Sequence, residues 1–188
     1  MKKSIVLTLA VFCGAQAPSN GAPTPTPTSP LPALVKSFSG HWALSVKFEP
    51  ASGLPPGTEG KGEETWRAAV GGKTLLSEES WQAGPMDMSL LGVIWWDANQ
   101  NKLHAMDCNN QGKSTCDPKD AAEAVVVNWS GGELTIEEPE RGPEGKLVTS
   151  RVTFKDIKPD SFSEIDSIAL TPGKFETMMT IRAVRAPK

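Results

Sequence analysis

The chain has 188 residues, of which 38% are hydrophobic and 22% are charged, and its formal net charge at pH 7 is −3. This length supplies one hydrophobic core rather than two, so a single folded domain is expected. Acidic and basic residues are interspersed along the chain, which predicts no extended basic surface and argues against nucleic-acid binding.

Residues 1–17 have the three-part layout of a secretory signal peptide. Lys2 and Lys3 precede the apolar run from Ile5 to Cys13, and small residues follow at positions 14, 15 and 17. Cleavage after Ala15 or after Ala17 would release an exported protein, periplasmic or extracellular. No later segment approaches the roughly 20 apolar residues of a membrane-spanning helix, so we expect no transmembrane segment in the mature protein.

Residues 18–33 are rich in proline and threonine and have few apolar side chains to bury. Such a composition predicts a disordered, extended linker. A lipid anchor on Cys13 would let this linker hold the domain away from a membrane surface. That arrangement is the minority alternative, because the bulky Phe12 stands where a small residue is expected before a lipidated cysteine.

The domain is expected to span residues 34–188 and to begin with a short helical turn near residues 34–38. Trp42, Leu44, Val46 and Phe48 then alternate with more polar residues, which is typical of a half-buried strand. Glycine-rich turns such as Gly71-Gly72 predict hairpins farther along the chain. In order, the ten expected strands lie near residues 42–48, 61–70, 73–82, 90–96, 102–108, 124–129, 133–138, 148–155, 161–169 and 174–185.

The stretch from Leu90 to Cys116 concentrates unusual residues: the Trp95-Trp96 pair, His104 and two of the three cysteines. It predicts a hairpin closed by a loop. Export favours a structural disulfide between Cys108 and Cys116. Metal binding is the weaker alternative, because no Cys-x-x-Cys motif is present and only His104 lies nearby.

Many short strands joined by turns predict an all-β, antiparallel fold, either a sandwich or a closed barrel. Sequential hairpins favour an up-and-down barrel, since pairing of the first strand with the last removes both sheet edges. We therefore predict an up-and-down barrel of about ten strands with a short N-terminal helical turn.

The motif Gly40-His41-Trp42 at the head of the first strand resembles the Gly-x-Trp opening of lipocalins and other calycins. In that superfamily the tryptophan packs under the barrel floor against a basic residue of the last strand, a role that the resemblance assigns to Arg182 or Arg185. Residues 70–76, 91–97 and 178–182 complete a pattern similar to an exported bacterial family of calycin-like proteins of unknown function. The resemblance implies a lipocalin-like barrel but no established activity.

No catalytic residue is predicted, because neither Gly-x-Ser-x-Gly nor a histidine-containing triad occurs. Glu63-Glu64 and Glu78-Glu79 fall on neighbouring strands, and adjacent strand residues point to opposite faces. One member of each pair could enter the lumen and give a weak hydrolase or isomerase. The simpler interpretation is that these glutamates are solvated charges.

A barrel of this size can be filled by side chains or can hold one small ligand. Neither a cofactor nor a metal is predicted, and His104 and Met106 share one face of a strand, which excludes a His/Met haem pair. We expect an exported, non-enzymatic barrel that binds a small hydrophobic ligand or serves as an interaction module of the cell envelope; a filled structural barrel is the alternative. The pocket candidates are Trp66, Trp81, Trp95, Trp96, His104, Met106, Met178 (or Met179) and Ile181. Ligand identity and oligomeric state stay open.

Overall fold

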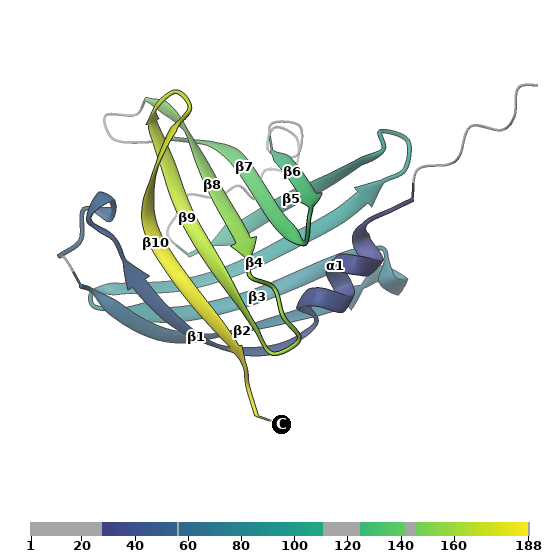
Figure 1. Cartoon of the computed structure of the whole chain (residues 1–188), viewed down its shortest axis with the longest axis horizontal. Coiled ribbons are helices and arrows are strands. Elements are labelled where there is room, and N and C mark those ends of the chain that lie inside the picture. The colour runs from purple at the N-terminus through teal and green to yellow at the C-terminus, as the bar shows by residue number, and fades with distance from the viewer. Residues whose placement is uncertain (1–27, 56, 111–124, 142–145, 188) are drawn as a thin grey trace, which may run out of the picture.

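The computed structural model describes residues 28–55, 57–110, 125–141 and 146–187. They form one antiparallel sheet of ten strands that curls into a nearly closed barrel with a short helix at one end (Figure 1). The predicted all-β barrel is therefore confirmed. Cys13, Cys116 and the predicted signal peptide lie outside the described residues, so the Cys108–Cys116 disulfide stays a prediction.

The helix α1 spans Leu31–Phe38, and two single 3₁₀ turns, η1 (Pro50–Ser52) and η2 (Val70–Gly72), lie in loops. The strands are β1 (Gly40–Phe48), β2 (Glu59–Ala69), β3 (Thr74–Ala83), β4 (Met86–Asp97), β5 (Lys102–Asn109), β6 (Val126–Ser130), β7 (Glu133–Arg141), β8 (Leu147–Lys155), β9 (Ser161–Thr171) and β10 (Lys174–Arg185).

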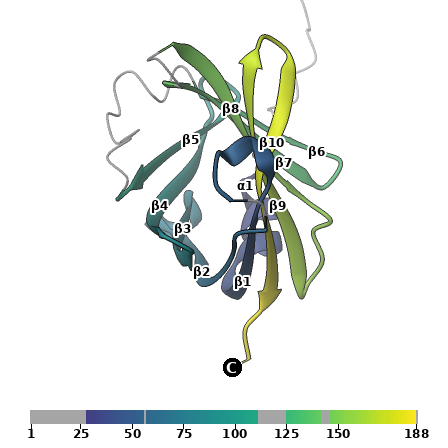
Figure 2. The ribbon, with the colours of Figure 1, turned by 90° about the vertical axis from the view of Figure 1, so that its left-hand side faces the viewer.

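Strand order follows the sequence almost everywhere, running β5-β4-β3-β2-β1-β10-β9-β8-β7-β6. The first strand pairs with the last, with Trp42 opposite Arg185 and Phe48 opposite Met179. Within the described residues, β5 and β6 are the two ends of the sheet and share no ladder. In Figure 2 the strands β2, β3, β4 and β5 lie on the left of the view, and β6, β7 and β9 lie on the right.

One predicted connection was wrong. Residues 83–88 separate the expected strands near residues 73–82 and 90–96 and were expected to form a connection. Instead, β3 and β4 are joined by the two-residue turn Gly84-Pro85, and β4 already begins at Met86. Gly84 has a φ of +56°, which glycine adopts without steric cost. Met86 and Met88 then alternate with the exposed Asp87 and Ser89, so the strand pattern extends farther upstream than expected.

Aromatic packing closes the α1 end of the barrel, which we call the floor. Phe38 and Trp42 are fully buried, and the Phe38 ring lies 5.4 Å from that of Phe162 and 4.9 Å from that of Trp66. The indole Nε1–H of Trp42 donates a hydrogen bond of 2.8 Å to the carbonyl of Phe38. This hydrogen bond joins the last residue of α1 to β1. It also satisfies the indole N–H of Trp42, which would otherwise be buried without a partner.

Arg185 covers the floor from the outside. Its guanidinium lies 4.2 Å from the centre of the Trp42 ring and donates hydrogen bonds to the carbonyls of Ser39 (3.2 Å) and Pro159 (2.8 Å). The other basic candidate, Arg182, lies opposite Ser45 on the outer face of the barrel. Of the two arginines proposed for this role, Arg185 is therefore the one that contacts the tryptophan.

Gly40 is needed for that contact. Its φ of +145° is a conformation that side-chain-bearing residues rarely adopt, and a Cβ atom here would overlap Nη1 of Arg185. The glycine of Gly40-His41-Trp42 thus makes room for the arginine that covers the tryptophan.

Candidate ligand site in the barrel lumen

The register of β2 decides which of its residues enter the lumen. Trp42 and Leu44, which are buried, lie opposite Glu64 and Gly62. Residues opposite each other in a ladder share a face, so Gly60, Gly62, Glu64 and Trp66 face inward. The exposed Glu63 faces outward instead, 3.6 Å from Nε2 of His41.

Glu64 lies directly opposite Glu79 of β3. Side chains at such positions have Cβ atoms roughly 5 Å apart, and like charges there repel each other. Both residues are buried, with exposed fractions of 2% and 9%. Their neighbours Glu63 and Glu78 face solvent, and Glu78 holds Arg67 at 3.0 Å. The interpretation of these glutamates as solvated charges is thus right for Glu63 and Glu78 and wrong for Glu64 and Glu79.

Further acidic residues face the same space from the opposite wall. Glu164 and Asp166 of β9 lie opposite Phe154 and Val152 of β8, and Glu138 of β7 lies opposite Ser150. Asp107 of β5 lies opposite Gly92. Asp107 belongs to the same side of the barrel as Glu64 and Glu79, and Glu140 of β7 also lines the space. Seven carboxyl groups from five strands therefore line one lumen in the described part of the chain.

Burial raises the pKa of most of these groups. Removal from water, which disfavours the charged form, raises the pKa of Glu79 and Glu138 to about 7 and that of Asp166 to about 8. The pKa values of Glu64 and Glu164 are also raised well above the usual range, first by burial and then by the negative charge of Glu79. The lumen therefore holds protonated and ionised carboxyl groups together near neutral pH.

The lumen is hollow on both sides of these acids. An inner pocket of about 90 Å³ lies towards α1, and an outer pocket of about 450 Å³ lies towards the opposite end, where Ser52 and Leu54 form part of its rim. The two pockets share six lining residues and therefore adjoin: Glu79, Leu90, Asp107, Glu138, Val152 and Glu164.

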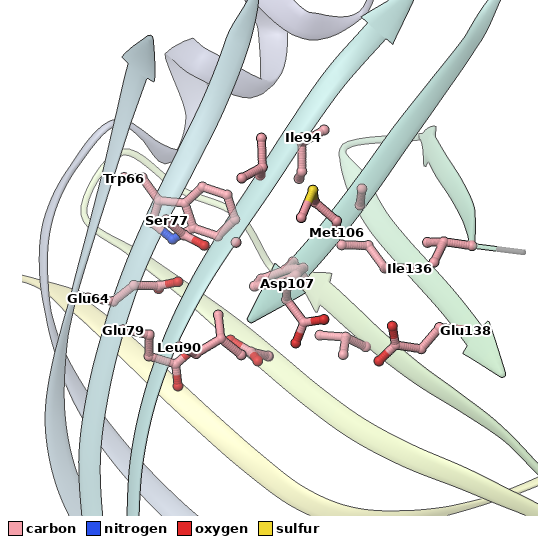
Figure 3. Close-up of a pocket in the computed structure, with 17 residues that line it drawn as sticks. Glu64, Trp66, Ser77, Glu79, Leu90, Ile94, Met106, Asp107, Ile136 and Glu138 are labelled. Carbon is pink, nitrogen blue, oxygen red and sulfur yellow. The ribbon is translucent and has the colours of Figure 1, made fainter. Parts of the chain in front are cut away.

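Polar and apolar side chains are segregated along this space. In Figure 3 Trp66, Ile94, Met106 and Ile136 gather nearer the helix, whereas Glu64, Glu79, Asp107 and Glu138 lie farther from it with their carboxyl groups directed into the pocket. The outer pocket adds Trp81, Phe48 and four methionines at positions 86, 88, 178 and 179. An occupant would thus meet a band of carboxyl groups between two apolar regions.

Four of the eight predicted pocket residues line these pockets. Trp66 and Met106 line the inner pocket, and Trp81 and Met178 line the outer one. Met179, the alternative to Met178, also lines the outer pocket.

The other four predicted residues lie elsewhere. Trp96 packs against the core, Ile181 is buried within it, and neither lines either pocket. Trp95 and His104 lie opposite each other on the outer face of β4 and β5, with their rings stacked at 5.3 Å. Strand alternation explains this result, because Ile94 and Trp96 take the inner face and leave the outer face to Trp95.

Sequence reasoning missed Glu138, Glu164 and Asp166. The alternation Phe162-Ser163-Glu164-Ile165-Asp166 places both acids on the face of Phe162, but it places Ile165 on the other face. Because each face of this strand carries an apolar residue, the sequence does not show which face is buried. The available clue was that Glu164 and Asp166 lie on the same face as the large aromatic residue Phe162.

The described residues contain no group of three or more His, Cys, Asp or Glu side chains arranged to hold a metal ion. They also include no helix with the length and hydrophobicity needed to cross a membrane.

Comparison with known proteins supports the fold alone. No family model and no curated protein matches the sequence. Among solved structures, the chain is similar to the crystal structure of Rv2717c from M. tuberculosis, with a TM-score of 0.52 and 15% sequence identity. The match covers 85% of this chain and 99% of that one. At this identity the likeness concerns the barrel architecture and carries no activity.

Proposed function

We propose that this protein is an exported, calycin-like barrel that binds a small hydrophobic ligand in its lumen. The observation that carries the proposal is the outer pocket of about 450 Å³, which adjoins the inner pocket and has Trp81, Phe48 and four methionines in its lining. Ligand sites are concave, mostly apolar and of about 300–1,000 Å³. Methionine side chains adapt to ligands of different shape.

The calycin relationship is supported by the floor, where Gly40, Trp42 and Arg185 are arranged as the resemblance implies. Export is supported by the sequence of residues 1–17. Expression of the full chain with a C-terminal tag, followed by cell fractionation and N-terminal sequencing, tests export. A mature N-terminus at residue 16 or 18 is expected, whereas an intact Met1 in the cytoplasm would contradict it.

Binding is tested with the neutral fluorescent probe N-phenyl-1-naphthylamine. We expect saturable binding that weakens at least fivefold in Trp81→Ala, in which the wall of the outer pocket is truncated. Val184→Ala, at an exposed position of β10, serves as the matched control and should bind as the wild type does. Native mass spectrometry of the purified protein checks for a co-purifying hydrophobic molecule. No binding of the probe and no co-purifying molecule would favour a protein that displays its surface to a partner at the cell envelope.

Acid–base catalysis is a second candidate, and the carboxyl cluster favours it. Glu79 and Glu138, each with a pKa raised to about 7, could donate or accept protons near neutral pH. The test is hydrolysis of p-nitrophenyl esters and glycosides by the wild type and by Glu79→Gln. Turnover that is lost in Glu79→Gln and kept in Glu78→Gln would support catalysis, and equal rates in all three proteins would exclude it for these substrates.

A further inference from the structure

We propose that the occupant of the lumen is a small amphiphilic amine, with its protonated nitrogen among Glu64, Glu79 and Glu164 and its hydrocarbon part in the methionine-lined outer pocket. This inference rests on the proposed ligand-binding function and names the chemical class of the ligand. Its support comes from the charge of the lumen, its unpartnered oxygen atoms and the arrangement of its apolar lining.

The lining of the two pockets is strongly acidic. It contains Glu64, Glu79, Asp107, Glu138, Glu140, Glu164 and Asp166. Arg151 is the one basic residue in either lining within the described chain. Its guanidinium is already engaged on the outer face of the barrel, 2.7 Å from Glu137 and 3.5 Å from the ring centre of Phe175. A cation that enters the lumen would therefore meet carboxyl groups and no competing positive charge.

Two oxygen atoms in the cluster have no hydrogen-bond partner among the described residues. They are Oε2 of Glu64 and Oδ1 of Asp166, and both are buried. Buried polar atoms in proteins are nearly always hydrogen-bonded, and exceptions call for an explanation. Glu64 is 2% exposed and lines the inner pocket, where Figure 3 shows its carboxyl group directed into the space. An ammonium group offers three N–H donors to such acceptors.

The surroundings favour an organic cation over a metal ion. The described residues contain no group of three or more acidic, histidine or cysteine side chains arranged to hold a metal. The outer pocket next to the acids is instead built from Trp81, Phe48 and methionines at positions 86, 88, 178 and 179. Apolar walls stabilise a hydrocarbon chain and offer nothing to a hydrated ion, so the ligand combines a positive charge with an apolar body.

Protons should leave when the amine binds. Burial raises the pKa of Glu64, Glu79 and Glu164, which face one another and Asp166, so the empty site holds protons near neutral pH. The alkylammonium ion is already protonated and interacts best with ionised carboxylates. We therefore expect a proton to be released on binding and the affinity to rise at least tenfold between pH 6 and pH 8.

The test is isothermal titration of the full mature chain at pH 7.5 with n-octylamine, octan-1-ol and octanoate. These probes share one hydrocarbon chain and differ in charge. We expect octylamine to bind at least tenfold more tightly than octanol, and octanoate to bind more weakly than either. If octanol binds as tightly as octylamine, the apolar pocket stands and the amine inference fails. If none of the three probes binds and N-phenyl-1-naphthylamine does not bind either, both proposals fail.

Glutamine variants of lumenal and solvent-facing glutamates show which carboxyl groups bind the ammonium group of octylamine. Glu64→Gln and Glu164→Gln should each lower octylamine affinity at least tenfold while octanol affinity changes less than twofold. Glu63→Gln and Glu78→Gln are neighbouring glutamates that face solvent, and they should leave both affinities unchanged. Octanol binding also shows that the variants are folded. Equal octylamine affinity in Glu64→Gln, Glu164→Gln and the wild type would overturn the proposal.

Divalent ions test the competing hypothesis that the carboxyl cluster binds a metal ion. Magnesium and zinc chloride at 1 mM should not displace octylamine. Displacement by either ion that disappears in Glu64→Gln would identify a metal site and overturn the assignment of an amine. Repeating the titration in buffers of different ionisation enthalpy measures the released proton, and no release at pH 7 would contradict the expected protonation of the empty site.

Discussion

Close to α1, the rings of Phe38, Trp42 and Phe162 fill the barrel, and the indole N–H of Trp42 is hydrogen-bonded to Phe38. In the middle of the same barrel, Glu64 and Asp166 have buried oxygen atoms without a partner in the described chain. Aromatic rings pack the first region closely, although Nε1 of Trp66 there has no hydrogen-bond partner in the described chain. The second region buries several carboxyl groups beside one another, which is far less common in a protein core. Residues that weaken a fold in this way are often found at functional sites, so we attribute stability chiefly to the floor and assign the proposed ligand binding to the acidic band.

The largest expected effect is on the floor. Trp42→Ala removes a fully buried indole together with its contacts to Phe38, Phe162 and Arg185. We expect the free energy of unfolding to fall by roughly 3–5 kcal/mol. Urea denaturation followed by circular dichroism measures it. The exposed control Val184→Ala should change stability by less than about 0.5 kcal/mol. Similar losses in the two variants would show that the floor is not the stabilising region.

The acidic band should give the protein an unusual pH dependence. The folded-state pKa values of these carboxyl groups lie above their unfolded values, so the folded protein binds more protons between about pH 4.5 and 8. Their stabilising contribution is complete below the unfolded pKa and is lost as the pH rises through the folded pKa. For Glu79, whose pKa rises from 4.5 to about 7, the loss is on the order of 3 kcal/mol.

Thermal unfolding of the ligand-free protein checks this expectation. The Tm should fall by roughly 5–10 °C between pH 5 and pH 8. Glu79→Gln should flatten the profile and raise the Tm at pH 8, whereas Glu78→Gln, which removes an exposed charge, should leave the profile unchanged. A wild-type Tm that rises steadily from pH 5 to pH 8 would contradict the buried, protonated state of the band.

A smaller effect is expected at the edge of the floor. Gly40→Ala places a methyl group against the Arg185 guanidinium and forces a side chain into a φ of +145°. The expected loss is about 1–3 kcal/mol. Arg182→Ala, on the outer face of β10, is the control and should cost less than about 0.5 kcal/mol. Urea titrations of both variants decide the comparison, and a tolerated alanine at position 40 would show that Arg185 can move without loss.

The floor was more predictable than the band for a physical reason. Alternation of Trp42, Leu44, Val46 and Phe48 with polar residues identifies both the strand and its buried face, and Gly71-Gly72 identifies a hairpin. Adjacent glutamates such as Glu63-Glu64 show that one must face inward, but hydrophobicity does not reveal which. The answer depends on the register with Trp42 across the ladder.

The acidic residues of β9 were harder still to predict from the sequence. Apolar patterning identifies a core by the residues that avoid water, so a lumen lined by Glu164 and Asp166 does not look like a core. Their proximity to Glu64 and Glu79 follows from closure of the barrel, which brings β9 across from β2 and β3. No local pattern encodes a contact of that kind.

Closure itself has a consequence for how the chain folds. Among the ladders of the described chain, only β1 with β10 joins strands that are distant in sequence, and Arg185 bonds Ser39 across 146 residues. The other eight ladders all pair strands that are consecutive in the sequence. Closing so long a loop is entropically unfavourable until the ends have partners. We expect the hairpins to form early and the β1–β10 ladder to form late. The contact between Trp42 and Arg185 would then form only in the last step of folding, when the barrel closes.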